Sequence, residues 1–167
     1  GTPGLRSGLK VEDAAGNVRL VGVRTRNADG SAPGLPPHLG IGSVSEDSAA
    51  DLDFWSDYEP GTLRNKWVDY RYIYINGGVK RKGVGWRTWT TVDGDRMRDF
   101  VRESVRRGMI PVVVWYNIPD GGESYTRNLE HIQDPGYMRG YYEDLAFAID
   151  LANEEAGDEP VVWVLEP

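Results

Sequence analysis

IPVVVWYNI, at residues 110–118, is a continuous run of mostly apolar residues that includes several β-branched ones. Such a run is typical of a strand buried on both faces of a parallel sheet. The segment before it, residues 93–107, has the period of an amphipathic helix and ends at Gly108. Its apolar stripe consists of Met97, Phe100, Val101 and Val105. These segments predict a helix that leads into a buried strand.

The same alternation continues toward the C-terminus. Residues 119–133 form a polar stretch that we interpret as a loop, and a helix is predicted to begin after Asp134 and to end at Gly157. The apolar stripe expected for this helix is Met138, Tyr141, Leu145, Ile149 and Ala152. A second buried strand is predicted at residues 161–165.

Toward the N-terminus the pattern is weaker. Strands are expected at residues 39–44 and 67–75, with a short helix at 47–55 between them and an irregular loop at 79–91. Strands that alternate with helices predict an α/β protein with a parallel sheet. We expect a partial (β/α)-barrel over residues 39–167, truncated at its C-terminal side because a complete barrel needs about 250 residues. A small β-hairpin and loop at 9–38 and a linker remnant at 1–8 are predicted to precede it.

The amino-acid composition limits the classes of partner and cofactor that we expect for this chain. The chain has 167 residues, a formal net charge of -7 and a pI near 4.9, which argues against nucleic acid or an anionic membrane as a partner. There is no cysteine, and the two histidines, His38 and His131, lack metal-ligand spacing, so no metal or other cofactor is expected. Six tryptophans and nine tyrosines could supply flat faces for sugar rings, although aromatic residues also fill cores.

Polar side chains follow the two best-defined strands, where the active sites of parallel α/β sheets lie. Tyr116, Asn117, Asp120, Glu123 and Tyr125 follow the first strand, and Glu166 follows the second. Glycosidic bond cleavage needs a proton donor and a second carboxylate, so Asp120, Glu123 and Glu166 are candidate catalytic residues. Tyr116, Asn117 and Tyr125 are candidate substrate-binding residues.

Two further tryptophans are candidate sugar platforms. Trp86 and Trp89 lie in the loop that a barrel would place over the site. The alternative for both is packing against the barrel rim.

The segments PVVVWYNIPDGGESY and VVWVLEP, about residues 111–167, resemble family 6 glycoside hydrolases, the cellobiohydrolases and endoglucanases that act on β-1,4-glucan. Tyr116 matches the active-site tyrosine of that family, and Glu166-Pro167 match the start of its Glu-Pro-Asp motif. The resemblance implies that the residue after Pro167 is an aspartate that acts as the general acid, with Glu166 in a supporting role. One departure is Gly122, which stands where the family has a functional aspartate.

A second alignment remains open. Clan-A retaining glycosidases end a strand in Asn-Glu-Pro, which Leu165-Glu166-Pro167 resembles in its last two residues. That resemblance implies Glu166 as the acid/base residue.

The resulting expectation is a secreted, extracellular glycosidase fragment that acts on a β-linked polysaccharide or oligosaccharide, with further domains in the same polypeptide. The fragment alone is expected to be inactive if the acid follows Pro167. One alternative is a non-catalytic carbohydrate-binding or interaction domain on a degenerate barrel. Another is a soluble (β/α) domain with unrelated small-molecule chemistry.

Overall fold

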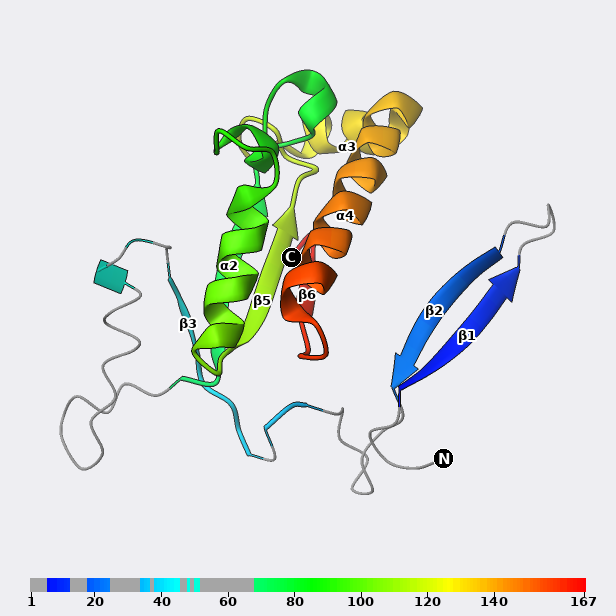
Figure 1. Cartoon of the computed structure of the whole chain (residues 1–167). Coiled ribbons are helices and arrows are strands. Elements are labelled where there is room, and N and C mark those ends of the chain that lie inside the picture. The colour runs from blue at the N-terminus through cyan, green and yellow to red at the C-terminus, as the bar shows by residue number, and fades with distance from the viewer. Residues whose placement is uncertain are drawn as a thin grey trace. The chain divides into compact units, whose positions relative to one another are not determined.

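A computed structural model of the chain describes residues 6–12, 18–24, 34–36, 38–45, 48, 50–51 and 68–167. The chain divides into two compact units, Gly1–Leu39 and Gly40–Pro167. Each is described by itself, and the larger one carries the parallel sheet (Figure 1).

The smaller unit contains a hairpin. Strands β1 (Arg6–Glu12) and β2 (Val18–Arg24) pair in an antiparallel register that runs from Arg6 opposite Arg24 to Glu12 opposite Val18. The strands pair where the sequence predicts a hairpin, but β1 begins at Arg6, inside the segment 1–8 that was predicted to be a linker. The turn between the strands lies outside the described residues, and so does most of the helix expected at 47–55.

The larger unit contains a four-stranded sheet of β3 (Gly42–Val44), β4 (Tyr70–Asn76), β5 (Ile110–Tyr116) and β6 (Val162–Leu165). All three pairings are parallel, and the order of the strands in space is their order in the sequence. The predicted α/β class with parallel strands is therefore confirmed. Among the described residues the sheet is open, with β3 and β6 at its edges.

Two helices, α2 (Asp95–Arg106) and α4 (Pro135–Ala156), pack against each other and against one face of this sheet (Figure 1). The core between them contains Ile73, Ile75, Val113 and Trp115 from the strands. Because side chains alternate along a strand, the residues between these face the opposite side. Tyr74 on that side is 46% exposed.

The helix boundaries follow from capping. The Asp134 carboxylate accepts a hydrogen bond from the Gly136 N–H at 2.7 Å, Pro135 is the first residue of α4, and Gly157 follows its end. In α2, Asp95 lies in the first turn and Arg106 in the last, as the helix dipole favours. Both helices therefore begin and end within about two residues of the predicted positions.

The loop predicted at 119–133 is wrong in its second half, because Tyr125–Gln133 forms helix α3. The Ser124 hydroxyl caps it by accepting from the Arg127 N–H at 3.4 Å. No residue of α3 is fully buried. Its apolar residues Tyr125, Leu129 and Ile132 recur at helical spacing but are exposed, so α3 buries no apolar face in the described structure.

Two predictions about burial also need correction. The side of α4 that is buried includes Tyr137, Tyr141, Asp144, Ala148 and Leu151, whereas Ile149 is 37% exposed. Strand β6 was predicted to be buried, yet Leu165 is 55% exposed, because β6 is an edge strand of the described sheet. No helix in the described part of the chain is long and apolar enough to cross a membrane.

Candidate functional site

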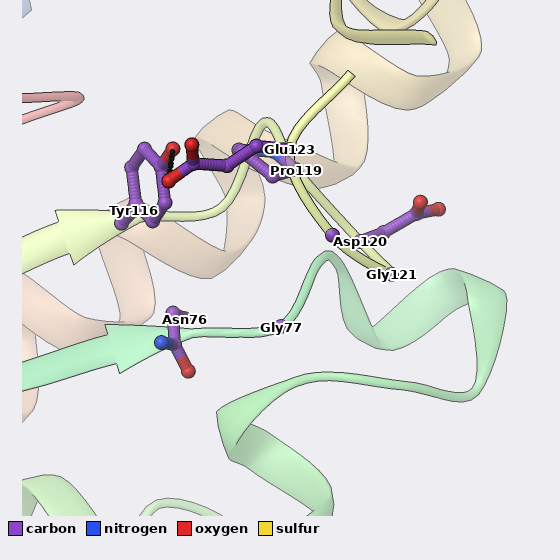
Figure 2. A pocket seen from close by; sticks show the side chains of 8 residues that line it. Asn76, Gly77, Tyr116, Pro119, Asp120, Gly121 and Glu123 are labelled. Carbon is purple, nitrogen blue, oxygen red and sulfur yellow. Dashed lines mark hydrogen bonds between the residues drawn. The ribbon is translucent and has the colours of Figure 1, made fainter.

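A hollow of about 350 Å³ lies at the carboxyl ends of β4 and β5. Asn76 and Tyr116, which are paired in register at the ends of these strands, form one side of it. The loop after β5 forms the other side, and Figure 2 shows how it folds back toward the strand ends. The lining consists of Asn76, Gly77, Tyr116, Pro119, Asp120, Gly121, Gly122 and Glu123.

One carboxylate in this hollow is paired with a hydroxyl. The Tyr116 hydroxyl donates a hydrogen bond to Glu123 Oε1 at 3.1 Å, and both side chains are drawn together in Figure 2. Partial burial, followed by the hydrogen bond to Glu123 and the nearby negative charges, raises the pKa of Tyr116 above its ordinary value. Tyr116 therefore remains a hydrogen-bond donor at neutral pH.

The side chain of Glu166 binds the backbone of the loop after β5. Glu166 Oε1 accepts from the Asn117 N–H at 2.9 Å, and Oε2 accepts from the Ile118 N–H at 3.3 Å. The Glu166 N–H donates to the Trp115 carbonyl at 2.8 Å, which extends the pairing of β5 with β6 by one residue. Since both carboxylate oxygens accept from backbone, the geometry favours a positioning role, one of the two roles expected for this residue.

The Asp120 carboxylate is turned away from Tyr116 and Glu123 (Figure 2). Its Oδ2 lies 3.5 Å from His131 Nε2. His131 Nδ1 lies 2.6 Å from the Ile118 carbonyl, and since a carbonyl only accepts, Nδ1 carries a proton. Nε2 can donate to Asp120 only when the imidazole is charged. The Tyr137 ring stacks on His131 with centroids 3.9 Å apart.

Asn117, a predicted substrate-binding residue, is fully buried and bonds to the protein's own backbone. Its side-chain Nδ2 donates to the Ile75 backbone carbonyl at 2.8 Å, and its backbone carbonyl accepts from the Tyr137 hydroxyl at 2.7 Å. Asn117 thus ties the end of β4 to the end of β5 beneath the hollow. Burial, followed by the negative charges of Asp120 and Glu166, raises the pKa of Tyr137 above its ordinary value.

The two candidate tryptophans lie in different environments. Trp86 is fully buried, with an edge-to-face contact to Trp115 and a stacked contact to Phe147, so it is not a sugar platform. Trp89 is 45% exposed and lines a second hollow of about 480 Å³ beside Asn76. Tyr125 is 83% exposed at the start of α3 and lines neither hollow.

The loop after β4, residues 77–94, contains two short 3-10 turns, η1 (Lys80–Lys82) and η2 (Trp86–Thr88). The Arg87 guanidinium binds Asp93 through Nε at 2.9 Å and Nη2 at 2.6 Å, and it binds Asp144 of α4 through Nη1 at 2.8 Å. Asp144 also accepts from the Lys80 N–H at 2.7 Å. The contacts with Asp144 attach the loop after β4 to helix α4.

The two loops touch where a glycine allows it. Gly78 has φ +95°, and a Cβ atom built there would lie 2.6 Å from the Cβ of Asp120. Any other residue at this position would push the loop after β5 away from the loop after β4.

The structure thus brings Tyr116, Asp120 and Glu123 to one hollow and places Glu166 behind it. Asn76 and Asp144 are not among the site residues predicted from the sequence, and neither is Tyr137. Asn76 could have been found as the last residue of its strand, but no sequence pattern points to the other two. In the described part of the chain, no group of three His, Cys, Asp or Glu residues is placed to hold a metal ion.

This chain matches no protein-family model, no curated protein and no solved structure.

Proposed function

We propose that this protein is an extracellular glycoside hydrolase of (β/α)-barrel type that acts on a β-linked polysaccharide such as β-1,4-glucan. The observation that carries the proposal is the Tyr116–Glu123 pair, which lines a hollow at the carboxyl ends of two neighbouring parallel strands. In barrels of this type, catalytic residues come from the carboxyl ends of strands and from the loops that follow them.

The sheet supports the barrel part of the proposal. Strands paired in sequence order, with α2 and α4 packed together on one face, are what the first turns of a (β/α)-barrel require. The opposite face carries Tyr74, Val114 and Tyr116, and it would become the barrel interior.

The chemistry divides between three carboxylates. Glu123 accepts a hydrogen bond from Tyr116 and is exposed, so it can take up a proton or approach a sugar carbon from the hollow. Asp120 is the second carboxylate of the same loop and lines the same hollow, with its Oδ2 3.5 Å from His131 Nε2. Glu166 positions this loop through its backbone.

The test is hydrolysis of soluble β-glucan by the full-length wild-type protein, by its Glu123→Gln variant and by the control Glu130→Gln on the exposed side of α3. Loss of a general acid or base lowers the rate by about 10²- to 10⁴-fold, and Glu123→Gln is expected to show that loss while oligosaccharide binding is retained. Glu130→Gln should behave as wild type. Equal turnover by wild type and Glu123→Gln would reject Glu123 as the catalytic residue.

A second candidate function is carbohydrate binding without hydrolysis. It is favoured by the orientation of Asp120 away from Glu123 and by the occupation of both Glu166 oxygens. Glycosidases generally use two carboxylates across the bond that they cleave. This candidate predicts that wild type and Glu123→Gln bind β-glucan oligomers equally and that neither releases reducing ends.

A further inference from the structure

The second hollow lies on the other side of Asn76 from the first. Its lining includes Val44, Tyr74, Trp89, Thr90 and Arg96 in addition to Asn76. Apolar and aromatic surface with a few polar groups and one charged residue is the general composition of a ligand pocket.

Asn76 connects the two hollows because it lines both. Figure 2 shows its amide pointing away from Tyr116 and Glu123. Within the described part of the chain, no hydrogen bond engages this amide, although it carries two donors and an acceptor. Its full hydrogen-bonding capacity is therefore open to a ligand.

Trp89 is close to this junction. A Cβ atom built on Gly77, a residue of the first hollow, would lie 3.8 Å from the Trp89 ring. Gly77 of the first hollow and the Trp89 ring of the second hollow are therefore neighbours.

The position of Trp89 is set by buried neighbours. The backbone N–H of Trp89 donates to the backbone carbonyl of Trp86 at 3.2 Å, and the Trp86 side chain is fully buried. Arg87, between the two tryptophans, is fixed by Asp93 and Asp144. An exposed ring on a backbone held in this way loses little conformational freedom when a ligand binds.

We propose that the second hollow binds a further unit of the same linear polysaccharide whose reacting unit occupies the Tyr116–Glu123 hollow. Trp89 contacts the apolar C–H face of that sugar, and Asn76 exchanges hydrogen bonds with its hydroxyls. The inference rests on the proposed function and adds that the protein selects long chains over short ones.

The experiment measures the Kd of β-1,4-linked glucose oligomers, from the dimer to the hexamer, for the full chain by calorimetry. Wild type is expected to bind the longer oligomers more tightly. Trp89→Ala is expected to weaken binding of the hexamer on the order of 10-fold, as for an aromatic anchor, and to leave the dimer unaffected. Asn76→Ala is expected to reduce the same length dependence.

Two variants keep the experiment interpretable. Tyr142→Ala removes another exposed aromatic side chain, 61% exposed on α4, and should keep the wild-type length dependence. Trp89→Phe retains a ring and should recover part of the affinity for the hexamer. Thermal unfolding shows whether each variant is folded.

The outcomes separate the two proposals. If wild type binds all oligomers equally, or if Trp89→Ala keeps the length dependence, the second hollow is not a sugar site and the proposed function still stands. If wild type neither binds nor cleaves any member of the series, the proposed function and this inference both fail.

Discussion

The loop after β4, residues 77–94, is attached to the domain mainly by ion pairs between side chains, whereas the loop after β5, residues 117–124, is attached mainly through its own backbone. In the first loop, Arg87 binds Asp93 and Asp144. In the second, backbone N–H and carbonyl groups of Asn117 and Ile118 bind side chains that project from β6, α3 and α4.

The two kinds of attachment, ion pairs and backbone hydrogen bonds, respond differently to substitution and to pH. An ion-pair network depends on the charge of its members, so one substitution or a change of pH affects the whole loop. Backbone bonds to separate side chains are lost one at a time. Four experiments test this contrast, ordered from the largest expected effect on stability to the smallest.

Asp144→Ala is expected to have the largest effect. Asp144 is 4% exposed, and its loss removes one partner of Arg87 and the acceptor for the Lys80 N–H. Breaking a buried ion pair on one side costs about 3 kcal/mol or more in the free energy of unfolding, measured by urea titration. The neighbouring Glu143→Ala, exposed on the same helix, is the control and should stay within about 0.5 kcal/mol of wild type. Equal effects of the two variants on the free energy of unfolding would show that the ion pairs of Arg87 do not hold the loop after β4.

Glu166→Gln tests the second loop. The change replaces one acceptor oxygen with a donor that faces a backbone N–H, which costs about 1 to 3 kcal/mol. Because the Asn117 and Ile118 amides each bond to one Glu166 oxygen and the change leaves a single acceptor oxygen, hydrogen exchange should speed up at one of these two residues and remain unchanged in residues 77–94. Glu159→Gln, on the exposed loop after α4, is the control. A general rise in exchange would mean that Glu166 supports the whole domain instead.

Acid should weaken the first loop through Asp93. The hydrogen bond from Arg87, followed by that from Lys80, lowers the pKa of Asp93 to about 2. The unfolded value is near 3.9, so the folded state favours the charged form, and this stabilisation is complete above about pH 4 and is lost as the pH falls toward 2. Asp93→Asn should flatten this part of the stability profile, whereas Asp150→Asn, on the exposed side of α4, should not. An unchanged profile in Asp93→Asn would contradict the assignment.

Tyr116→Phe should have the smallest effect on stability. The substitution removes one hydrogen bond to an exposed carboxylate, worth about 1 kcal/mol or less. This hydrogen bond attaches neither loop to a helix. Thermal unfolding should therefore be close to that of wild type. If Tyr116 and Glu123 belong to the binding site, the same variant weakens oligosaccharide binding. A large loss of stability would instead assign the pair to the fold.

The fold was predictable where side-chain pattern and capping agree. The helix after Asp134 and the strand at 110–116 follow from Pro135, Gly157 and a continuous apolar run. Helix α3 was missed because it is short and directly follows the turn residues Pro119–Gly122, although Tyr125, Leu129 and Ile132 recur at helical spacing. The stripe of α4 was misplaced because one of its buried positions is Asp144, whose partner Arg87 lies 57 residues away in the sequence.

The site was predictable to the level of the strand ends. The rule that parallel strands present polar loops at one edge found Tyr116, Asp120 and Glu123. It could not separate Trp86 from Trp89, because two tryptophans in one loop look alike until the core is packed around one of them. Nor could it show that Asn117 bonds inward, because this depends on the Ile75 carbonyl of another strand.

The strand order described above also has a consequence for synthesis on the ribosome. Strands β4, β5 and β6 each pair with the strand that precedes them, so β4, α2 and β5 are complete once residue 116 has emerged. Domains form in step with elongation when their contacts join neighbouring segments. In this sheet no late strand has to enter between two that are already paired. The chain can therefore extend its sheet from one edge during translation, with α2 already packed against β5 before α4 arrives.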